Sequence, residues 1–340
     1  MYQRIAISYL CFAMWAIASV HSVFANPIKI VFGAGSSTDL SADRLYNTFS
    51  DQLSLPGSRF KVKLMVRGEG GSDEQNFYSV RRGRMQMGGV SYGAISTVIP
   101  ELAVLNAPFL FESYDEIDFV LSNGLQDIIN DMLYQNGLVG FRHIPASWHI
   151  IYSKKPLLLP RGARNLRMRS RIDASSFLFL KALQADVIHV TGTEVIPSLQ
   201  TGLIDAGETN SFVYTLGGIY TEAPNLTMSR HVPSVTAIIG NKKWWDSLTV
   251  REKEMINNAL APAWIWRSGM RLDETRLLAK YKTEGVQIHN LTAANRQKWI
   301  EKSFSSHKEL VSRIGGGAEE LYRKIINSTN AYRAQNKLTQ

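Results

Sequence analysis

The sequence predicts an α/β protein whose sheet is parallel or mostly parallel. Short apolar runs typical of strands alternate with segments that carry apolar residues at helical spacing, first over residues 28–90 and again from about residue 147. In addition, residues 249–252 form a capping box that opens a long helical segment, which Pro262 should kink, and a kinked long helix can join two lobes. Ligands of such sheets bind beyond the carboxyl ends of the strands.

The expected elements follow one another in a regular order. In the first unit, Leu45, Phe49 and Leu53 share one face of a helix. The strands expected there are 28–32, 62–66 and 85–90, and the helices are 42–53 and 73–82. Residues 114–136 read as helical and lead to the second unit. Its strands are expected at 148–153, 166–171, 187–190 and 203–206, and its helices at 175–184 and 193–201.

The N-terminus has the pattern of a secretory signal peptide. Residues 1–25 carry one charged residue, Arg4, before an apolar stretch, and they end in the small-residue cleavage pattern Val23-Phe24-Ala25. The apolar stretch is too short and interrupted for a membrane anchor, so we expect cleavage to leave about 315 residues of soluble, exported protein. Cys11 is the only cysteine and lies inside the signal, so the exported chain cannot form disulfides and must rely on its core.

The charge balance favours anionic partners. The chain has 38 Lys and Arg against 29 Asp and Glu, a formal net charge of +9. The basic residues are scattered and no nucleic-acid-binding motif is present, so nucleic acid is not an expected partner. The histidines show no paired spacing typical of metal ligands, and we expect neither a metal site nor a cofactor.

Three arginines alternate in the stretch NLRMRSR, residues 165–171. In a strand, Arg167, Arg169 and Arg171 would point to one face, because side chains alternate between faces. The stretch is either an edge strand protected by charge or a place where one planar guanidinium binds a carboxylate through two hydrogen bonds. The residues by themselves leave both interpretations open.

One motif suggests an enzyme. Residues 89–93 match G-x-S-x-G after a strand, the pattern in which α/β-hydrolases expose a nucleophilic serine, here Ser91. Asp205 and His231 follow in the order of a hydrolase triad, although no oxyanion-hole glycine motif precedes Ser91. An exported serine hydrolase is therefore an alternative. A dinucleotide fingerprint at 33–38 is discounted, because Thr38 replaces its third glycine.

Four segments in register resemble the periplasmic substrate-binding proteins of TRAP (tripartite ATP-independent periplasmic) transporters. They are GRMQMGGVSYGAISTVIPELAVLNAPFLF (83–111), KKPLLLPRGARNLRMRSR (154–171), TEVIPSLQTGLIDAGE (193–208) and NKKWWDSLTVREKEMI (241–256). The resemblance covers essentially the whole exported chain. It implies a two-lobed periplasmic binding protein fold with a central ligand cleft, crossing strands and a long hinge-spanning helix. After the signal peptide at 1–25, it implies a first lobe at 26–146 and 235–274 and a second at 147–234 and 275–340.

The same resemblance implies a function without chemistry. The protein is expected to be a monomeric receptor in the periplasm that captures a small organic acid and delivers it to TRAP permease subunits in the inner membrane. Closure of the two lobes, with bending near residues 146, 235 and 274, would hold the ligand. A periplasmic protein that senses a ligand for a receptor kinase is a further alternative.

The resemblance also implies the site residues. Arg169 aligns with the family's carboxylate-binding arginine, whereas Arg167 and Arg171 are expected to be surface charges. His149 and Thr209 stand where family members often carry arginine and asparagine, so we expect them to influence which acid is bound. The remaining candidates are aromatic walls and hydrogen-bonding residues near these positions: Trp148, Phe212, Tyr92, Ser91 and Asn210. Glu194 and Glu208 are expected to be structural, because a carboxylate that faced an anionic ligand would oppose it.

Overall fold

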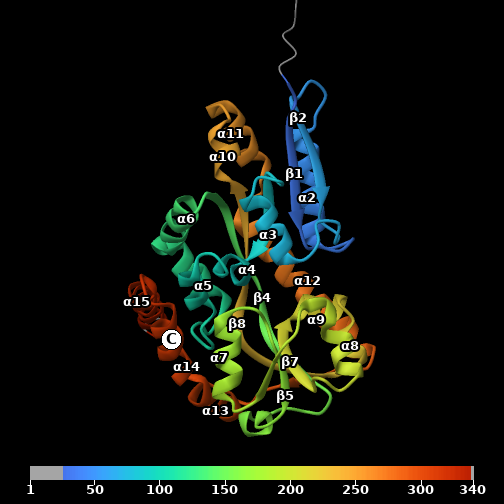
Figure 1. Ribbon diagram of the computed structural model, residues 1–340, viewed down its shortest axis with the longest axis vertical. Helices are drawn as coiled ribbons and strands as arrows, with labels where there is room; N and C mark the ends of the chain where they lie inside the picture. Colours follow the sequence, from blue (N-terminus) through green and yellow to red (C-terminus); the bar gives the residue numbers. More distant parts are fainter. Residues whose placement is uncertain (1–25, 338–340) are drawn as a thin grey trace, which may run out of the picture.

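The computed structural model describes residues 26–337, so the expected signal peptide lies outside the described residues. The chain forms two α/β lobes that follow one another along the long axis of the molecule (Figure 1). Strands β1 to β3 lie in the first lobe, strands β5 and β7 lie in the second, and β4 and β8 run between them (Figure 1). The predicted α/β class and the two-lobed architecture are confirmed.

One sheet of nine strands runs through residues 26–337, in the order β2-β1-β3-β8-β4-β7-β5-β6 with β9 on β8. The strands are β1 (Ile28–Ala34), β2 (Phe60–Met65), β3 (Met87–Ser91), β4 (Leu138–Ser153), β5 (Arg167–Ser170), β6 (Asp186–His189), β7 (Ala206–Asn210), β8 (Asn225–Asn241) and β9 (Gln287–Asn290). Pairing is parallel among β2, β1 and β3 and among β7, β5 and β6. It is antiparallel where β8 meets β3 and β4 and where β4 meets β7. The sheet is therefore mostly parallel within each lobe and antiparallel where the lobes join.

The two long strands β4 and β8 pair with each other and connect the lobes. Their register shifts between Pro145 and Ser147, where the partners are Val235 and Ser234. Such irregularities bend a strand and increase its local twist. The two strand positions expected for the hinge, 146 and 235, fall at this shift.

The helices cover both faces of the sheet (Figure 1). They are α2 (Ser41–Leu53), α3 (Asp73–Arg81), α4 (Tyr92–Ser96), α5 (Tyr114–Val120), α6 (Gln126–Gln135), α7 (Ala174–Ala182), α8 (Val195–Gln200), α9 (Ser211–Leu216), α10 (Lys242–Asp246), α11 (Val250–Ala259), α12 (Ala263–Thr283), α13 (Ala293–Ser303), α14 (Ser305–Ile314) and α15 (Ala318–Lys337). A 3₁₀ segment, η1, spans Pro100–Asn106. None of the helices in residues 26–337 combines the length and apolar character that a membrane span requires.

Three local predictions differ from the structure. Pro262 does not kink a helix but separates two, because α11 ends at Ala259 and α12 begins at Ala263. The helical stretch 114–136 is interrupted at Gly124, whose φ of 94° is incompatible with a continuous helix. A strand was expected at 203–206, but residues 203–205 belong to the turn after α8. The observed strand, β7, begins at Ala206.

Apolar side chains form separate cores on the two faces of the sheet. In the first lobe, neighbouring residues Ile238 and Ile239 of β8 enter different clusters, as strand alternation requires. In the second lobe, Ile150 and Ile151 of β4 do the same. Helix α12 contributes Trp266 to a first-lobe cluster and its later residues to a second-lobe cluster, so it spans both lobes.

The C-terminal helices contact both lobes. Helices α13 and α14 contact α7 in the second lobe, whereas α15 packs against α5 and η1 of the first lobe. Arg333 of α15 donates a hydrogen bond to Glu116 of α5 at 2.6 Å. Residues 275–340 were expected in the second lobe. The last helix, α15, lies instead on elements of the first lobe.

Candidate functional site

The three alternating arginines have three different environments. The side chain of Arg167 is 47% exposed and pairs with Asp205 at 2.9 Å. Arg169 is 9% exposed. The side chain of Arg171 is 15% exposed and contacts two carboxylates that are each 1% exposed. Only Arg167 therefore has the character of a surface charge.

Arg169 is a buried cation without a carboxylate partner. Its Nε donates to the carbonyl of Val190 at 3.0 Å, and its Nη1 donates to the carbonyl of Glu208 at 3.2 Å. Within residues 26–337 it forms no ion pair, and its Nη2 makes no hydrogen bond. Burial lowers the pKa of this guanidinium. The two carbonyls fix the orientation of the group but leave its charge uncompensated.

Gly207 makes room for this arrangement. It pairs with Arg169 across β5 and β7 and with Tyr152 across β4 and β7. A Cβ at this position would lie 2.3 Å from the Tyr152 hydroxyl and 3.0 Å from Arg169 Cβ. Any side chain at position 207 would therefore displace one of these two residues.

Arg171 belongs to a buried ionic network, and its expected role as a surface charge is wrong. Its Nη2 lies 3.1 Å from Asp173 Oδ2 and its Nε lies 3.2 Å from Glu208 Oε1. His231 Nε2 lies 2.9 Å from the other oxygen of Glu208. Because β5 ends at Ser170, side-chain alternation no longer applies to Arg171. Its guanidinium reaches Glu208, which shares a sheet face with Ile151 and not with Arg169.

The charges of the network determine its protonation. Burial by itself would raise the pKa of Glu208, but Arg171, His231 and His149 together lower it well below the usual range. Burial, reinforced by Arg171, lowers the pKa of His149 well below 6.5. The pKa of His231 is also lowered, again mainly by burial. At neutral pH both imidazoles are therefore neutral and Glu208 is ionised beside Arg171.

The first lobe contributes a polar pair, Ser91 and Asp73, opposite the ionic network of the second lobe. The Ser91 hydroxyl donates to Asp73 and accepts from the amide of Ala94 at the start of α4. Burial raises the pKa of Asp73 to about 6, although the hydrogen bond from Ser91 opposes this rise. A Cβ on Gly93 would lie 3.4 Å from Ser91 Oγ and 3.7 Å from Asp173 Oδ2. The polar groups of the two lobes thus face each other at Gly93.

The serine hydrolase alternative is not supported by these contacts. The hydrogen-bond partners of Ser91 are Asp73 and Ala94, whereas His231 contacts Ser229 and Glu208. Asp205 pairs with Arg167. The three members of the expected triad are therefore in separate places.

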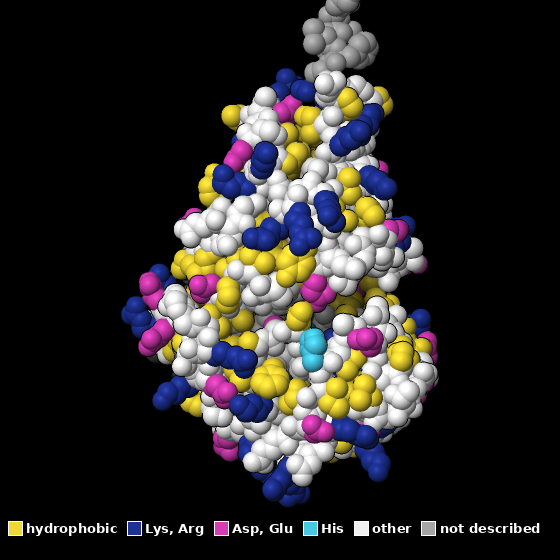
Figure 2. All heavy atoms as spheres, viewed as in Figure 1, with side chains coloured by type: hydrophobic (Ala, Val, Ile, Leu, Met, Phe, Trp, Pro, Cys, Tyr) yellow, Lys and Arg dark blue, Asp and Glu magenta, His cyan; other side chains and the backbone are white. Residues whose placement is uncertain are grey.

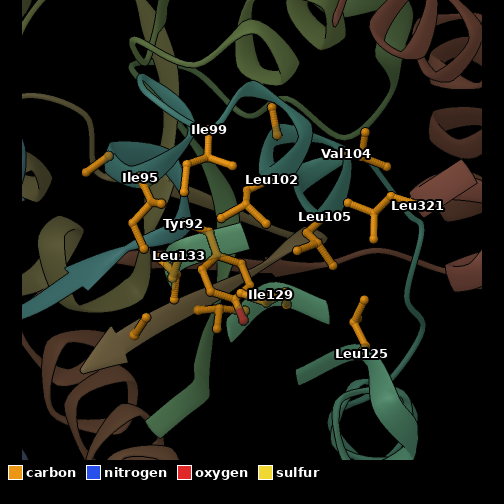
Figure 3. Close-up of a cluster of buried hydrophobic side chains, with 14 of the residues drawn as sticks. Tyr92, Ile95, Ile99, Leu102, Val104, Leu105, Leu125, Ile129, Leu133 and Leu321 are labelled. Carbon is orange, nitrogen blue, oxygen red and sulfur yellow. The ribbon is translucent and has the colours of Figure 1, made fainter. Parts of the chain in front are cut away.

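The other predicted site residues are spread over different environments. Tyr92 lies in the first-lobe core, where its hydroxyl bonds His143 Nδ1 at 2.8 Å, so it is a core residue (Figure 3). Trp148 is 4% exposed and packs on Tyr114 with ring centroids 5.4 Å apart. Asn210 accepts from the amide of Val213 and so caps α9. Phe212, which follows it in α9, is partly exposed.

Thr209 and His149 lie on opposite faces of the sheet. Thr209 is two residues from Gly207 on β7 and so shares the face of Arg169. His149 is on the face of Glu208, with its Nδ1 at 2.6 Å from Arg171 Nη1. The sequence placed both near Arg169, but His149 is a neighbour of Arg171.

Sequence reasoning missed Asp73 and Asp173. Asp73 is the first residue of an expected helix and opens α3, whereas Asp173 lies in the connection between an expected strand and an expected helix and caps α7. The rule that sites lie beyond the carboxyl ends of strands applies to both and would have selected them.

The surface is hollowed between the lobes, with a histidine at the lower rim (Figure 2). A cavity of about 250 Å³ lies at the carboxyl ends of β5 and β6, beside the ionic network. Its lining includes Arg171, Asp173, Phe177, His189 and Arg313. Within residues 26–337, no group of three His, Cys, Asp or Glu side chains has an arrangement that could hold a metal ion.

The pattern of the bacterial extracellular solute-binding proteins, family 7 (DctP), matches residues 36–313. The chain belongs to this family. Over 249 residues, it is 25% identical to the C4-dicarboxylate-binding periplasmic protein DctP of Rhodobacter capsulatus, covering 72% of this chain and 74% of the relative. Over 284 residues, it is 22% identical to the ectoine-binding periplasmic protein TeaA of Halomonas elongata, covering 81% and 83%.

Solved structures of other solute-binding proteins have the same fold. The sugar acid binding protein DctPAm of Advenella mimigardefordensis, in complex with galactonate, superposes with a TM-score of 0.83 at 26% identity over 90% of this chain and 99% of its own. A TRAP periplasmic solute-binding protein of Shewanella oneidensis with bound succinate gives a TM-score of 0.81 at 18% identity, covering 89% and 99%. The expected TRAP substrate-binding family is therefore confirmed, and it is a family of receptors rather than enzymes.

Proposed function

We propose that this solute-binding protein is exported through the signal peptide at residues 1–25, captures a small organic acid in the periplasm as a monomer, and delivers it to TRAP permease subunits. The uncompensated charge of Arg169 carries the ligand part of the proposal. A guanidinium that is 9% exposed and lacks a carboxylate partner loses hydration without recovering it from the protein. A ligand carboxylate supplies the missing charge and accepts the free hydrogen bonds of Nη2.

The network beside Arg169 favours a ligand with one bound carboxylate. Arg171 is already matched by Asp173 and Glu208, and the neutral imidazoles add no charge. A second ligand carboxylate at this network would therefore be repelled by a net negative cluster. Hydroxyl groups, which donate to Asp173 and Asp73, are better suited to it. Galactonate, named for the Advenella relative, has this combination of groups, whereas succinate has two carboxylates.

Closure of the two lobes is the proposed mechanism of capture. We propose lobes of residues 26–146 with 235–274 and of 147–234 with 275–317, with bending near 146, 235 and 274, while α15 rests on the first lobe. The contacts of Glu274 support this position on α12, because its carboxylate accepts from Tyr114 of α5 at 2.8 Å and from Ser211 of α9 at 2.7 Å. A ligand that contacts both lobes only when they are closed shifts the population toward the closed form.

The test begins with a thermal-shift screen of mono- and dicarboxylic acids, since a ligand that binds only the folded protein raises its apparent stability. Calorimetric titration with the best acid then compares variants. Arg169→Ala should weaken binding by about a hundredfold or more, because a buried charge loses its partner. Arg169→Lys should recover little, since one ammonium cannot form two parallel hydrogen bonds. Thr209→Ala and His149→Gln should change the ranking of acids.

Arg167→Ala is the matched control, because it removes the same group two residues away at an exposed ion pair. If Arg169→Ala binds as tightly as Arg167→Ala, the carboxylate is held elsewhere and the assignment is wrong. The acid should also be recovered chemically unchanged after incubation with the protein, and a hydrolysed or oxidised product would contradict the receptor function.

A further inference from the structure

A basic turn at the end of α3 carries three arginines in four positions. Arg81, Arg82 and Arg84 are all exposed. Within the described chain, none of the three forms an ion pair or donates a side-chain hydrogen bond. Figure 2 shows Lys and Arg side chains gathered across the first lobe, over the region where Figure 1 places α3. The Arg82 guanidinium lies 5.6 Å from the centre of the Tyr78 ring, a contact that leaves its hydrogen-bond donors available to a partner, as are those of Arg81 and Arg84.

The backbone holds these arginines in a fixed arrangement. Gly83 adopts a φ of 74°, which favours glycine, and the amide of Arg84 returns to the carbonyl of Ser79 at 2.9 Å. Asn241 of β8 donates to the carbonyls of Val80 at 3.0 Å and Arg81 at 3.2 Å. A surface that is already ordered loses less conformational entropy when it binds a partner.

The same turn borders a cavity of about 470 Å³ on the outer side of α3. Its lining contains two of the three arginines, three neutral hydrogen-bonding side chains and one carboxylate: Arg82, Arg84, Gln75, Tyr78, Ser79 and Glu69. The one carboxylate among them, Glu69, already accepts the amide of Arg67 at 2.6 Å. None of these residues belongs to the candidate site around Arg169.

We propose that the α3 arginine surface, consisting of Arg81, Arg82, Arg84 and this cavity, docks an acidic segment of a protein partner. The inference rests on the proposed function, which supplies that partner as the membrane permease. The planar fork of arginine matches a carboxylate through two hydrogen bonds, and the cavity of about 470 Å³ has room for an Asp or Glu side chain beside Arg82 and Arg84.

A protein partner fits this surface better than a lipid bilayer. A bilayer presents a continuous flat layer of anionic headgroups, whereas Arg82, Arg84 and the hydrogen-bonding groups beside them line a cavity. The concave shape also keeps part of the binding surface away from a flat layer. Arginine forks and hydrogen-bonding groups inside a cavity are typical of a site that accepts individual side chains.

The experiment measures binding of the full chain to an immobilised peptide of glutamate and aspartate at about 0.15 M salt, where only short-range charge contacts persist. The triple variant Arg81→Glu, Arg82→Glu, Arg84→Glu should bind the peptide about tenfold or more weakly, since three charge contacts become repulsive. Vesicles containing phosphatidylglycerol are tested in parallel. Stronger binding to vesicles than to the peptide would overturn the proposal.

A matched control separates a specific surface from net charge. Lys29, Lys61 and Lys63 are exposed on neighbouring strands of the same lobe, and Lys29 pairs with Lys61 across β1 and β2. Their triple substitution by Glu changes the net charge equally and should leave peptide binding within about twofold. Equal losses in both triple variants would show that net charge alone attracts the peptide, and the docking surface would be refuted.

The two proposals of this protein can fail separately. Arg169→Ala should leave peptide binding unchanged, while the triple arginine variant should retain the organic acid affinity of the native chain. Loss of acid binding in Arg169→Ala with unchanged peptide binding in the triple variant would contradict only the docking surface.

Discussion

Replacing Arg171 by Ala should destabilise the protein far more than replacing Arg167. The substitution leaves Asp173 and Glu208 without their cation, and both are 4% exposed or less. Removing one partner of a buried ion pair destabilises a protein by about 3–5 kcal/mol, because the remaining charge stays desolvated. Arg167 pairs with Asp205 at an exposed position, so Arg167→Ala should change the free energy of unfolding by about 0–1 kcal/mol.

The effect should depend on pH in a defined direction. Arg171 is the main group that lowers the pKa of Glu208 against the opposing effect of burial. A carboxyl group with a lowered pKa in the folded state stabilises the protein above its unfolded pKa, near 4.5, and this stabilisation is lost as pH falls through the folded pKa. The difference between Arg171→Ala and the native chain should therefore be full at pH 7 and smaller at strongly acidic pH.

Urea denaturation followed by far-ultraviolet circular dichroism measures these differences. Arg171→Ala and Arg167→Ala are compared with the native protein at pH 7 and in acid. The urea concentration at each unfolding midpoint, multiplied by the slope of free energy against urea, gives the free energy of unfolding. Arg171→Met, which keeps much of the side-chain volume, shows whether packing or charge is responsible. Equal midpoints for Arg171→Ala and Arg167→Ala at pH 7 would refute the buried network.

Two further outcomes are expected. Small-angle scattering should give a smaller radius of gyration when a bound acid closes the lobes, and superimposable curves for free and saturated protein would contradict hinge closure. Burial lowers the pKa of His143 to about 4, so the folded state keeps this imidazole neutral while the unfolded chain protonates below about 6.5. The free energy of unfolding should therefore fall by about 3 kcal/mol from this group as pH drops from 6.5 to 4. The contribution of His143 to this loss of stability should be absent in His143→Gln. It should be retained in the control His189→Gln, because His189 is exposed.

The sequence by itself determined the local elements and the family. Alternating strands and helices over residues 28–90 were predicted within a few residues of β1, α2, β2, α3 and β3. The capping box at Thr249 was also predicted, and its side chain accepts from the amide of Glu252. These features depend on interactions within a few residues of the chain, which periodicity and capping residues express directly.

Where local rules competed, the prediction was wrong. Pro262 ended a helical segment instead of bending it, and Gly124 interrupted the helix between residues 114 and 136. In both places the apolar pattern continued through the break, because the two flanking helices bury faces in the same region of the fold. Periodicity therefore could not locate the break.

Only the tertiary structure decided what each arginine does. Alternation placed Arg167, Arg169 and Arg171 on one face, but their environments depend on where β5 ends and on which residues β7 brings beside it. Glu208 is 37 positions or more away along the chain from each of them, yet its carboxylate pairs with Arg171 and its carbonyl holds Arg169. A charge becomes structural when a distant partner neutralises it and available to a ligand when none does, and partners of this kind are set by strand order and register rather than by neighbouring residues.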